Sequence, residues 1–356
     1  MKELVSIIIP VYEAARHVEE CLESALEQKY SPLEILLVND GSTDEGPAIC
    51  ETYSRKYEHV RVLHQEHQGA GVARETGVRN AKGKYILFLD ADDKLEEEHS
   101  ISKLVEQAMQ SVADITVGSF RTFSEAGISD VNEHHLEKET DTDSISFRFK
   151  GYFQYSHLGF QWGKLYRKEF LENNRIQSPL YSYIEDKAYN MRCSACKPRY
   201  AFVKESVYQY RLNREVVPFQ DKNDFTQVWT RVAKDFEGFL QERECTEKYA
   251  DMIAFHMFLG AYSLAKIKLN QSPWGIWSLR NALKEYGSDI FTQKYLRKLA
   301  KGEYLRQIDA TVWKMVIRMA SGMFVLRGYL FMALGLTLLN ALRLDKAVIA
   351  KKYRKK

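Results

Sequence analysis

The chain has 356 residues, enough for one large or two ordinary domains with apolar cores of their own. Its 51 lysines and arginines nearly balance its 48 aspartates and glutamates, and the small net charge of +3 argues against a nucleic-acid partner. Five scattered cysteines and the lack of a secretory segment at the start of the sequence favour a reducing, cytoplasmic location.

The N-terminal part of the chain alternates short apolar runs with amphipathic helical patterns. The apolar runs predict buried strands at 4–9, 33–38, 60–63 and 84–89. Helical spacing and capping residues predict helices at 18–26, 42–57 and 72–79. Strands and helices in this alternation imply an α/β fold with a parallel, doubly wound, Rossmann-like sheet and right-handed crossovers.

The pattern is less regular after the fourth predicted strand. It predicts a helix at 101–109, a strand at 114–120 and a loop at 124–143, where polar residues follow no period. Aromatic residues then become dense from 147 to 210, and helical periodicity dominates from 224 to about 300. A change of domain near residue 220 follows from this shift.

We therefore expect three parts along the chain. An α/β domain occupies 1–220, a helical region 221–305, and an apolar helical segment with a basic tail 306–356. The longest uncharged run of the last part, 328–342, is shorter than the roughly 20 apolar residues that a membrane-spanning helix needs. The last part is therefore not predicted to cross a membrane.

The last part carries basic residues beside its apolar ones. Residues 313–344 are rich in Met, Leu, Phe and Ala, and residues 345–356 contain six basic residues and one acid. An apolar helix with a basic tail is typical of a helix that lies on an anionic membrane surface. We therefore expect a peripheral protein on the cytoplasmic face of the inner membrane. The alternative is a helical hairpin buried in the interface of a homo-oligomer.

Polar residues follow each of the four predicted strands of the N-terminal half. They are Pro10-Val11-Tyr12-Glu13, Asp40-Gly41-Ser42, Gly69 to Arg74, and Asp90-Ala91-Asp92-Asp93. In open α/β sheets, ligands bind beyond the carboxyl ends of the strands. Neighbouring carboxylates repel unless they share a cation, and their oxygens suit Mg²⁺ or Mn²⁺. The set predicts a site for a metal and a nucleotide diphosphate, although the acids could instead cap a helix.

These motifs together resemble a known family. The runs Ile-Ile-Pro-Val-Tyr, Val-Asn-Asp-Gly-Ser-Thr-Asp, Gly-Val-Ala-Arg-Glu-Thr-Gly and Tyr-Ile-Leu-Phe-Leu-Asp-Ala-Asp-Asp, with a later Glu-Asp, are similar to those of the inverting GT-A-fold glycosyltransferases of family 2, of the bacterial cell-surface glycan type. The resemblance covers about residues 4–215. It implies metal-dependent transfer of one sugar from a UDP-sugar to a hydroxyl of a cell-surface glycan or lipid-linked precursor, with Mn²⁺ or Mg²⁺ as cofactor.

The resemblance also implies roles for individual residues. The nucleotide would be held by residues at the strand ends, with Asp40 on the uracil: Pro10, Val11, Tyr12, Glu13, Asp40, Gly71, Arg74, Asp90 and Ala91. Asp92 would coordinate the metal, and Asp186 would be the general base with Glu185 as its partner. Trp162 and Lys164 would belong to the acceptor-side wall.

Other functions fit the sequence less well. A dinucleotide-dependent dehydrogenase is disfavoured because the first strand ends in Pro-Val-Tyr and not in a G-x-G-x-x-G turn. The Gln-x-x-Arg-Trp element of processive family members is missing, which favours the addition of one sugar per encounter. Glu13 stands where the family usually has Asn. A catalytically weak or inactive subunit that acts in binding or assembly remains the alternative.

Overall fold

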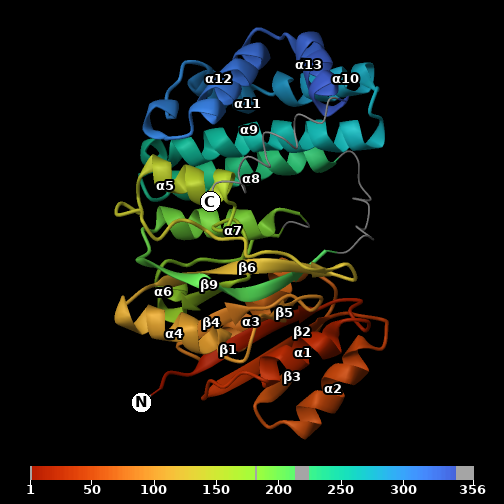
Figure 1. Cartoon of the computed structure of the whole chain (residues 1–356), viewed down its shortest axis with the longest axis vertical. Helices are drawn as coiled ribbons and strands as arrows, with labels where there is room; N and C mark the ends of the chain where they lie inside the picture. The colour runs from red at the N-terminus through yellow and green to blue at the C-terminus, as the bar shows by residue number, and fades with distance from the viewer. Residues whose placement is uncertain (1, 181–182, 213–223, 342–356) are drawn as a thin grey trace. The chain divides into compact units, whose positions relative to one another are not determined.

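The computed structural model describes residues 2–180, 183–212 and 224–341. The chain divides into two compact units, 1–217 and 218–356, and each is described by itself (Figure 1). The further division expected at residue 305 stays a prediction. The tail expected at 345–356 lies outside the described residues.

The first unit is built on a mixed sheet. Its strands are β1 (Val5–Val11), β2 (Leu33–Asp40), β3 (Val60–Gln65), β4 (Tyr85–Phe88), β5 (Lys94–Leu95), β6 (Ile115–Ser124), β7 (Gly127–Ile128), β8 (Lys164–Arg167) and β9 (Tyr200–Arg211). They are ordered β3-β2-β1-β4-β8-β6-β9-β5, and β7 pairs with β6. The α/β fold class and the four expected N-terminal strands are confirmed.

The sheet is parallel only in part. Strands β3, β2, β1 and β4 run parallel, as expected. Strand β8 runs antiparallel to β4, and β5 runs antiparallel to β9. The parallel arrangement predicted for the four N-terminal strands is confirmed, and the strands that follow them make the sheet mixed. The four residues of β8, Lys-Leu-Tyr-Arg, lack the continuous apolar run that marks a buried parallel strand.

Helices follow the strands of the first unit. They are α1 (Val18–Leu26), α2 (Gly46–Lys56), α3 (Ala70–Asn80), α4 (Ser100–Gln110), α5 (Ile145–Phe149) with a π-helical turn at Lys150–Gln154, α6 (Lys168–Asn173) and α7 (Glu185–Ala195). Helix α2 begins four residues later than expected from Ser42. The Asp44 carboxylate accepts the backbone N–H of Gly46 at 2.9 Å and that of Ala15 at 2.7 Å, so it joins the start of α2 to the loop after β1.

The core places the four N-terminal strand ends at one edge of the sheet. The side chains of β1 and β2 are almost completely buried, because these strands lie in the middle of the parallel part. The register pairs Val11 with Asn39 and Asn39 with His64, while Ile8 pairs with Phe88. The polar residues after these strands therefore meet at a common edge.

The second unit is helical. It contains α8 (Asp224–Gln241), α9 (Thr246–Gln271), α10 (Ile276–Ser288), α11 (Ile290–Ala300), a 3₁₀ turn at Leu305–Gln307, α12 (Thr311–Val325) and α13 (Tyr329–Ala341). Helix α9 packs against α8, α10 and α11. Among the described residues, α9 alone is long and apolar enough to cross a membrane, but 67% of its most apolar stretch is buried inside this unit. It is the core helix of the unit.

Helix α3 packs closely on β1 at a glycine, and this contact can be tested. A Cβ atom at Gly77 would lie 2.3 Å from Cγ2 of the fully buried Ile8. We expect Gly77→Ala to destabilise the first unit by about 1–3 kcal/mol, because overpacking outweighs the gain of about 1 kcal/mol in helix propensity. Urea unfolding with hydrogen exchange in β1 and α3 measures the change.

A helical glycine with free space around it provides the control. A Cβ atom at Gly238 in α8 would meet nothing within 4 Å, so Gly238→Ala should keep or raise the stability of α8. Equal effects of the two substitutions would contradict the close contact between Gly77 and Ile8.

Candidate active site

Asp40, at the end of β2, holds the loop before α3. Its carboxylate accepts the backbone N–H groups of Gln68 at 2.9 Å and Gly69 at 2.8 Å, and the side-chain amide of Gln65 at 2.7 Å. Only 1% of the residue is exposed. The structure thus shows Asp40 shaping the loop, and its contact with uracil stays a prediction.

The ends of β1 and β2 are tied together beside this loop. Tyr12 stacks on the His67 ring with centroids 4.0 Å apart, and half of Tyr12 is exposed, so its ring can cover a ligand. The Glu13 carboxylate accepts the backbone N–H of Thr43 at 2.7 Å and its hydroxyl at 3.0 Å. Val11 is buried and Pro10 is half-buried in the strand. These residues form a polar rim with one exposed aromatic ring.

Gly71, in the first turn of α3, allows a second segment to approach. A Cβ atom there would lie 3.0 Å from the carbonyl oxygen of Pro179. The Glu75 carboxylate, one turn later, accepts the backbone N–H of Ser178 at 3.3 Å. The start of α3 and residues 178–179 are thereby brought together, and α7 begins shortly after them.

Arg74 brings the predicted catalytic and nucleotide-binding acids together. Its Nη2 donates to Asp90 Oδ1 at 2.7 Å, and its Nη1 donates to Asp186 Oδ1 at 3.0 Å and to Glu185 Oε1 at 3.4 Å. The Arg74 side chain is 5% exposed, while those of the three acids are 18–23% exposed. One buried cation therefore faces three carboxylates that border on solvent.

The environment of Asp186 changes its acidity. Burial raises the pKa of Asp186 to about 7, the Glu185 and Asp90 charges add to the rise, and Arg74 opposes it. The other carboxylate oxygen, Oδ2, accepts the backbone N–H of Gln161 at 3.3 Å. A carboxylate whose pKa lies near neutral pH suits proton transfer.

Gln161 was not predicted from the sequence. It is fully buried, and its Oε1 accepts a hydrogen bond from Arg74 Nη1 at 3.3 Å. Its Nε2 and the Nε of Arg74 have no hydrogen-bond partner among the described residues. Both atoms are donors, and buried donors without a partner are uncommon. Gln161 directly precedes Trp162, which the sequence assigned to the acceptor side, and this neighbour is the signal that could have found it.

The acids after β4 take different positions. Asp93 is buried, where its carboxylate accepts the Tyr208 hydroxyl at 2.8 Å and the Arg211 backbone N–H at 2.7 Å. Burial raises the pKa of Asp93, and the charges of Asp90 and Asp92 add to the rise. Ala91 is buried, and Asp92 is half-buried. Strand β9 thus holds the turn, with Asp93 as its anchor.

The two residues expected at the acceptor side are both buried. Trp162 stacks between aromatic rings, with centroid distances of 4.4 Å to Phe160 and 4.7 Å to Tyr208. The Lys164 amine donates to the Phe160 carbonyl, and burial lowers the pKa of Lys164 to about 7. Tyr210 also stacks on Trp162, with ring centroids 5.4 Å apart, and is partly exposed. The acceptor roles of Trp162 and Lys164 stay predictions.

The aspartates after β4 suit a metal ion that is bound partly by the protein and partly by the phosphates of a substrate. No group of three or more His, Cys, Asp or Glu residues that could hold a metal occurs in residues 2–180, 183–212 and 224–341. Mg²⁺ commonly binds through one or two carboxylates together with substrate phosphates, and so needs no protein cage. Asp92 and Asp90 could supply these carboxylates, whereas both oxygens of Asp93 are engaged by β9.

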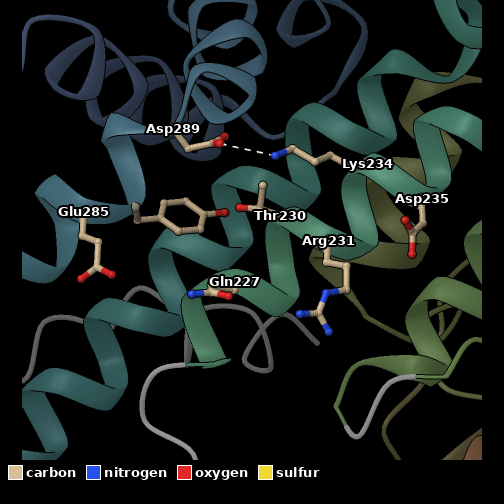
Figure 2. Close-up of a pocket in the computed structure, with 8 residues that line it drawn as sticks. Gln227, Thr230, Arg231, Lys234, Asp235, Glu285 and Asp289 are labelled. Carbon is tan, nitrogen blue, oxygen red and sulfur yellow. Dashed lines mark ion pairs between the residues drawn. The ribbon is translucent and has the colours of Figure 1, made fainter.

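A separate polar cavity lies within the second unit (Figure 2). It has a volume of about 390 Å³ and is lined by Gln227, Thr230, Arg231, Lys234, Asp235, Glu285, Tyr286 and Asp289. Lys234 and Asp289 pair across it at 3.5 Å, as the dashed line shows. Its lining charges have both signs, and it contains none of the residues predicted from the sequence. We assign no function to it.

Comparison with known proteins identifies the family. The family model described as Glycosyl transferase family 2 matches residues 6–175. The glycosyltransferase GlyG of Streptococcus pneumoniae is 30% identical over 241 residues, which cover 65% of this chain and 77% of GlyG. The chain belongs to glycosyl transferase family 2. This family 2 chain is therefore a glycosyltransferase, as its motifs predicted.

Other relatives of this family 2 protein are similar over more of its length. The uncharacterized glycosyltransferase EpsJ of Bacillus subtilis is 29% identical over 315 residues, which cover 86% of each chain. The crystal structure of S. aureus TarS 1–349 in complex with UDP-GlcNAc has a TM-score of 0.61 at 19% identity, and covers 89% of this chain and 91% of that one. The GT-A fold is confirmed.

The raised pKa of Asp186 predicts a stability that depends on pH. An unfolded aspartate has a pKa of about 3.9, so the folded state binds the proton more tightly, and stability falls as the pH rises from about 4 to about 7. Asp186→Asn resembles the protonated acid. It should raise the unfolding temperature most at about pH 8, less at about pH 5, and little at about pH 4.

The matched control is an exposed carboxylate at the other edge of the sheet. Glu58 precedes β3, and Glu58→Gln should change the unfolding temperature equally at these pH values. If Asp186→Asn also gave equal changes, or destabilised the protein more at high pH, the assigned acidity of Asp186 would be wrong.

Proposed function

We propose that this family 2 protein transfers one sugar from a UDP-sugar to a hydroxyl of a cell-surface glycan or a lipid-linked precursor, with inversion at the anomeric carbon. The contact of Arg74 with Asp90, Glu185 and Asp186 carries the proposal, because it places a cation and a candidate base together. The sequence motifs support inversion and one transfer per encounter. The TarS complex with UDP-GlcNAc supports a uridine nucleotide as the donor.

The donor would meet the strand-end residues and Arg74. Tyr12 offers an exposed ring for the base. The buried donors at Arg74 Nε and Gln161 Nε2, which have no partner among the described residues, suit oxygens of the diphosphate or the sugar. Asp92, with Asp90, would hold a Mn²⁺ or Mg²⁺ ion that supplies further positive charge beside the diphosphate.

Asp186 would act on the acceptor. In the transfer, an acceptor oxygen forms a bond to the anomeric carbon while the bond from that carbon to the diphosphate oxygen breaks. The acceptor proton passes to the Asp186 carboxylate, whose raised pKa favours accepting it near neutral pH. The leaving diphosphate gains negative charge, which the Arg74 guanidinium stabilises from a buried position.

The base assignment predicts a loss of turnover without a loss of donor binding. Asp186→Asn keeps the shape of the side chain but cannot accept a proton, so the release of UDP should fall by about 10²- to 10⁴-fold. A panel of UDP-sugars, tested by thermal shift, finds the donor first. Donor at about 100 times its dissociation constant adds about 2.7 kcal/mol, and this gain should be similar in the variant.

The outcomes separate the proposed enzyme from its alternative. Glu58→Gln is the control and should keep full turnover. A protein that binds a UDP-sugar but releases no UDP with any glycan or lipid-linked acceptor would support the inactive subunit. Equal loss of donor binding and turnover in Asp186→Asn would make Asp186 a donor-site residue.

The metal assignment makes a separate prediction. Asp92→Ala should remove the part of UDP-sugar binding that depends on Mn²⁺ and lower turnover by more than tenfold, a loss above about 1.4 kcal/mol. Calorimetry with and without Mn²⁺ measures the binding, and Glu58→Ala is the control. Retention of more than about a tenth of the activity would show that Asp92 does not hold the metal.

A further inference from the structure

Helix α12 exposes an apolar stripe. Val312, Met315, Val316 and Met319 are exposed, and their spacing of three, four and seven residues places them on one side of the helix. The buried residues of α12, among them Ile317, lie on another side. A helix of a globular protein normally buries such a stripe, so this one lacks the usual cover among the described residues.

Helix α13 and the turn before it continue this apolar surface. Their exposed apolar residues are Leu326, Leu330, Phe331, Leu334 and Leu338. Helix α12 packs on α11 and α13 packs on α10, while α12 also contacts α13 and α10 contacts α11. Both stripes therefore face away from the same pair of helices, and Figure 1 shows α12 and α13 at the margin of this unit. We name these nine residues of α12, α13 and their connection the outer apolar face.

The outer apolar face is larger than ordinary surface exposure explains. Single apolar side chains are common on protein surfaces, but a contiguous group marks a site of interaction. By contrast, α8 and α9 expose no large apolar side chain among their described residues. Helices α10 and α11 expose Trp277 and Ile290, one large apolar side chain each, whereas α12 and α13 expose a row of them.

Charge identifies what covers this face. No acidic residue occurs between Asp309 and Asp345, whereas Lys314, Arg318 and Arg327 lie among the described residues of this segment. Of these cations, Arg327 follows Leu326 within the outer apolar face, whereas Arg318 donates to the Ala300 carbonyl of α11. In a symmetric dimer the same face would meet itself, so Arg327 would meet a second cation with no acid of this segment to pair with. An anionic lipid surface supplies both an apolar layer and the opposite charge.

We propose that the outer apolar face binds the surface of an anionic bilayer, with its large side chains at the boundary between headgroups and acyl chains. Arg327, in the turn before α13, then lies near the headgroups. This proposal does not depend on the proposed transfer reaction. It deepens the expectation from the sequence by naming the helices and side chains that make the contact.

Flotation of the full-length protein with vesicles tests the proposal. The protein should float with vesicles of phosphatidylcholine and phosphatidylglycerol, and less with phosphatidylcholine alone, and added salt should weaken the first binding. The triple variant Phe331→Gln, Leu334→Gln and Leu338→Gln should lower the partition coefficient at least tenfold, since each substitution removes a large apolar side chain from the surface that would enter the bilayer.

Matched variants separate the apolar and electrostatic contributions. Met109, Val112 and Ile128 of the first unit are similarly exposed, and their joint replacement by Gln should leave the binding unchanged. Arg327→Gln should bind neutral vesicles as before and show a weaker preference for anionic ones. Circular dichroism and thermal unfolding show that each variant is folded.

Three results would overturn the proposal. The first is a folded triple variant that floats as well as the unchanged protein, and the second is an unchanged protein that ignores anionic vesicles. The third is a protein that is dimeric in solution and becomes monomeric in the triple variant, which would assign the outer apolar face to a second copy of the chain.

Discussion

The first unit depends on one buried guanidinium. Arg74 on α3 binds Asp90 after β4 and both Glu185 and Asp186 at the start of α7, so it joins three segments that are far apart in the chain. Loss of Arg74 would leave three partly buried carboxylates without their shared cation, at a cost of about 3–5 kcal/mol. The contact therefore restricts how these segments can be arranged. It also places the candidate base next to the cation proposed for the diphosphate.

The same contact explains how Asp186 can act as a base beside the carboxylates of Glu185 and Asp90. Burial raises the pKa of Asp186, and without Arg74 the neighbouring acids would raise it further. The balance leaves a group that can exchange a proton near neutral pH. The raised pKa of Asp186 lowers the stability of the folded protein at alkaline pH. Such a loss is common where a site keeps charged groups for function. A second anchor, the contact of Asp93 with Tyr208 and Arg211 of β9, keeps the turn between Asp90 and Asp92 in place.

The second unit uses apolar helices in two ways. Helix α9 buries most of its apolar residues among α8, α10 and α11. Helices α12 and α13 have similar residues but leave a row of them exposed. The composition of these helices does not distinguish the two outcomes, because exposure depends on how many neighbours surround each helix. Packing within the unit therefore separates a core helix from a surface for binding.

The sequence by itself determined the parallel half of the sheet and the family. Continuous apolar runs such as 4–9 and 33–38 must be buried, and the turns after them carry motifs that few families share. Tertiary structure alone decided that β8 is antiparallel, that Lys164 and Trp162 are buried, and that Gln161 contacts Arg74. Local patterns report the burial of a strand or helix face. The surroundings of a single polar side chain depend on segments that the chain brings together only when it folds.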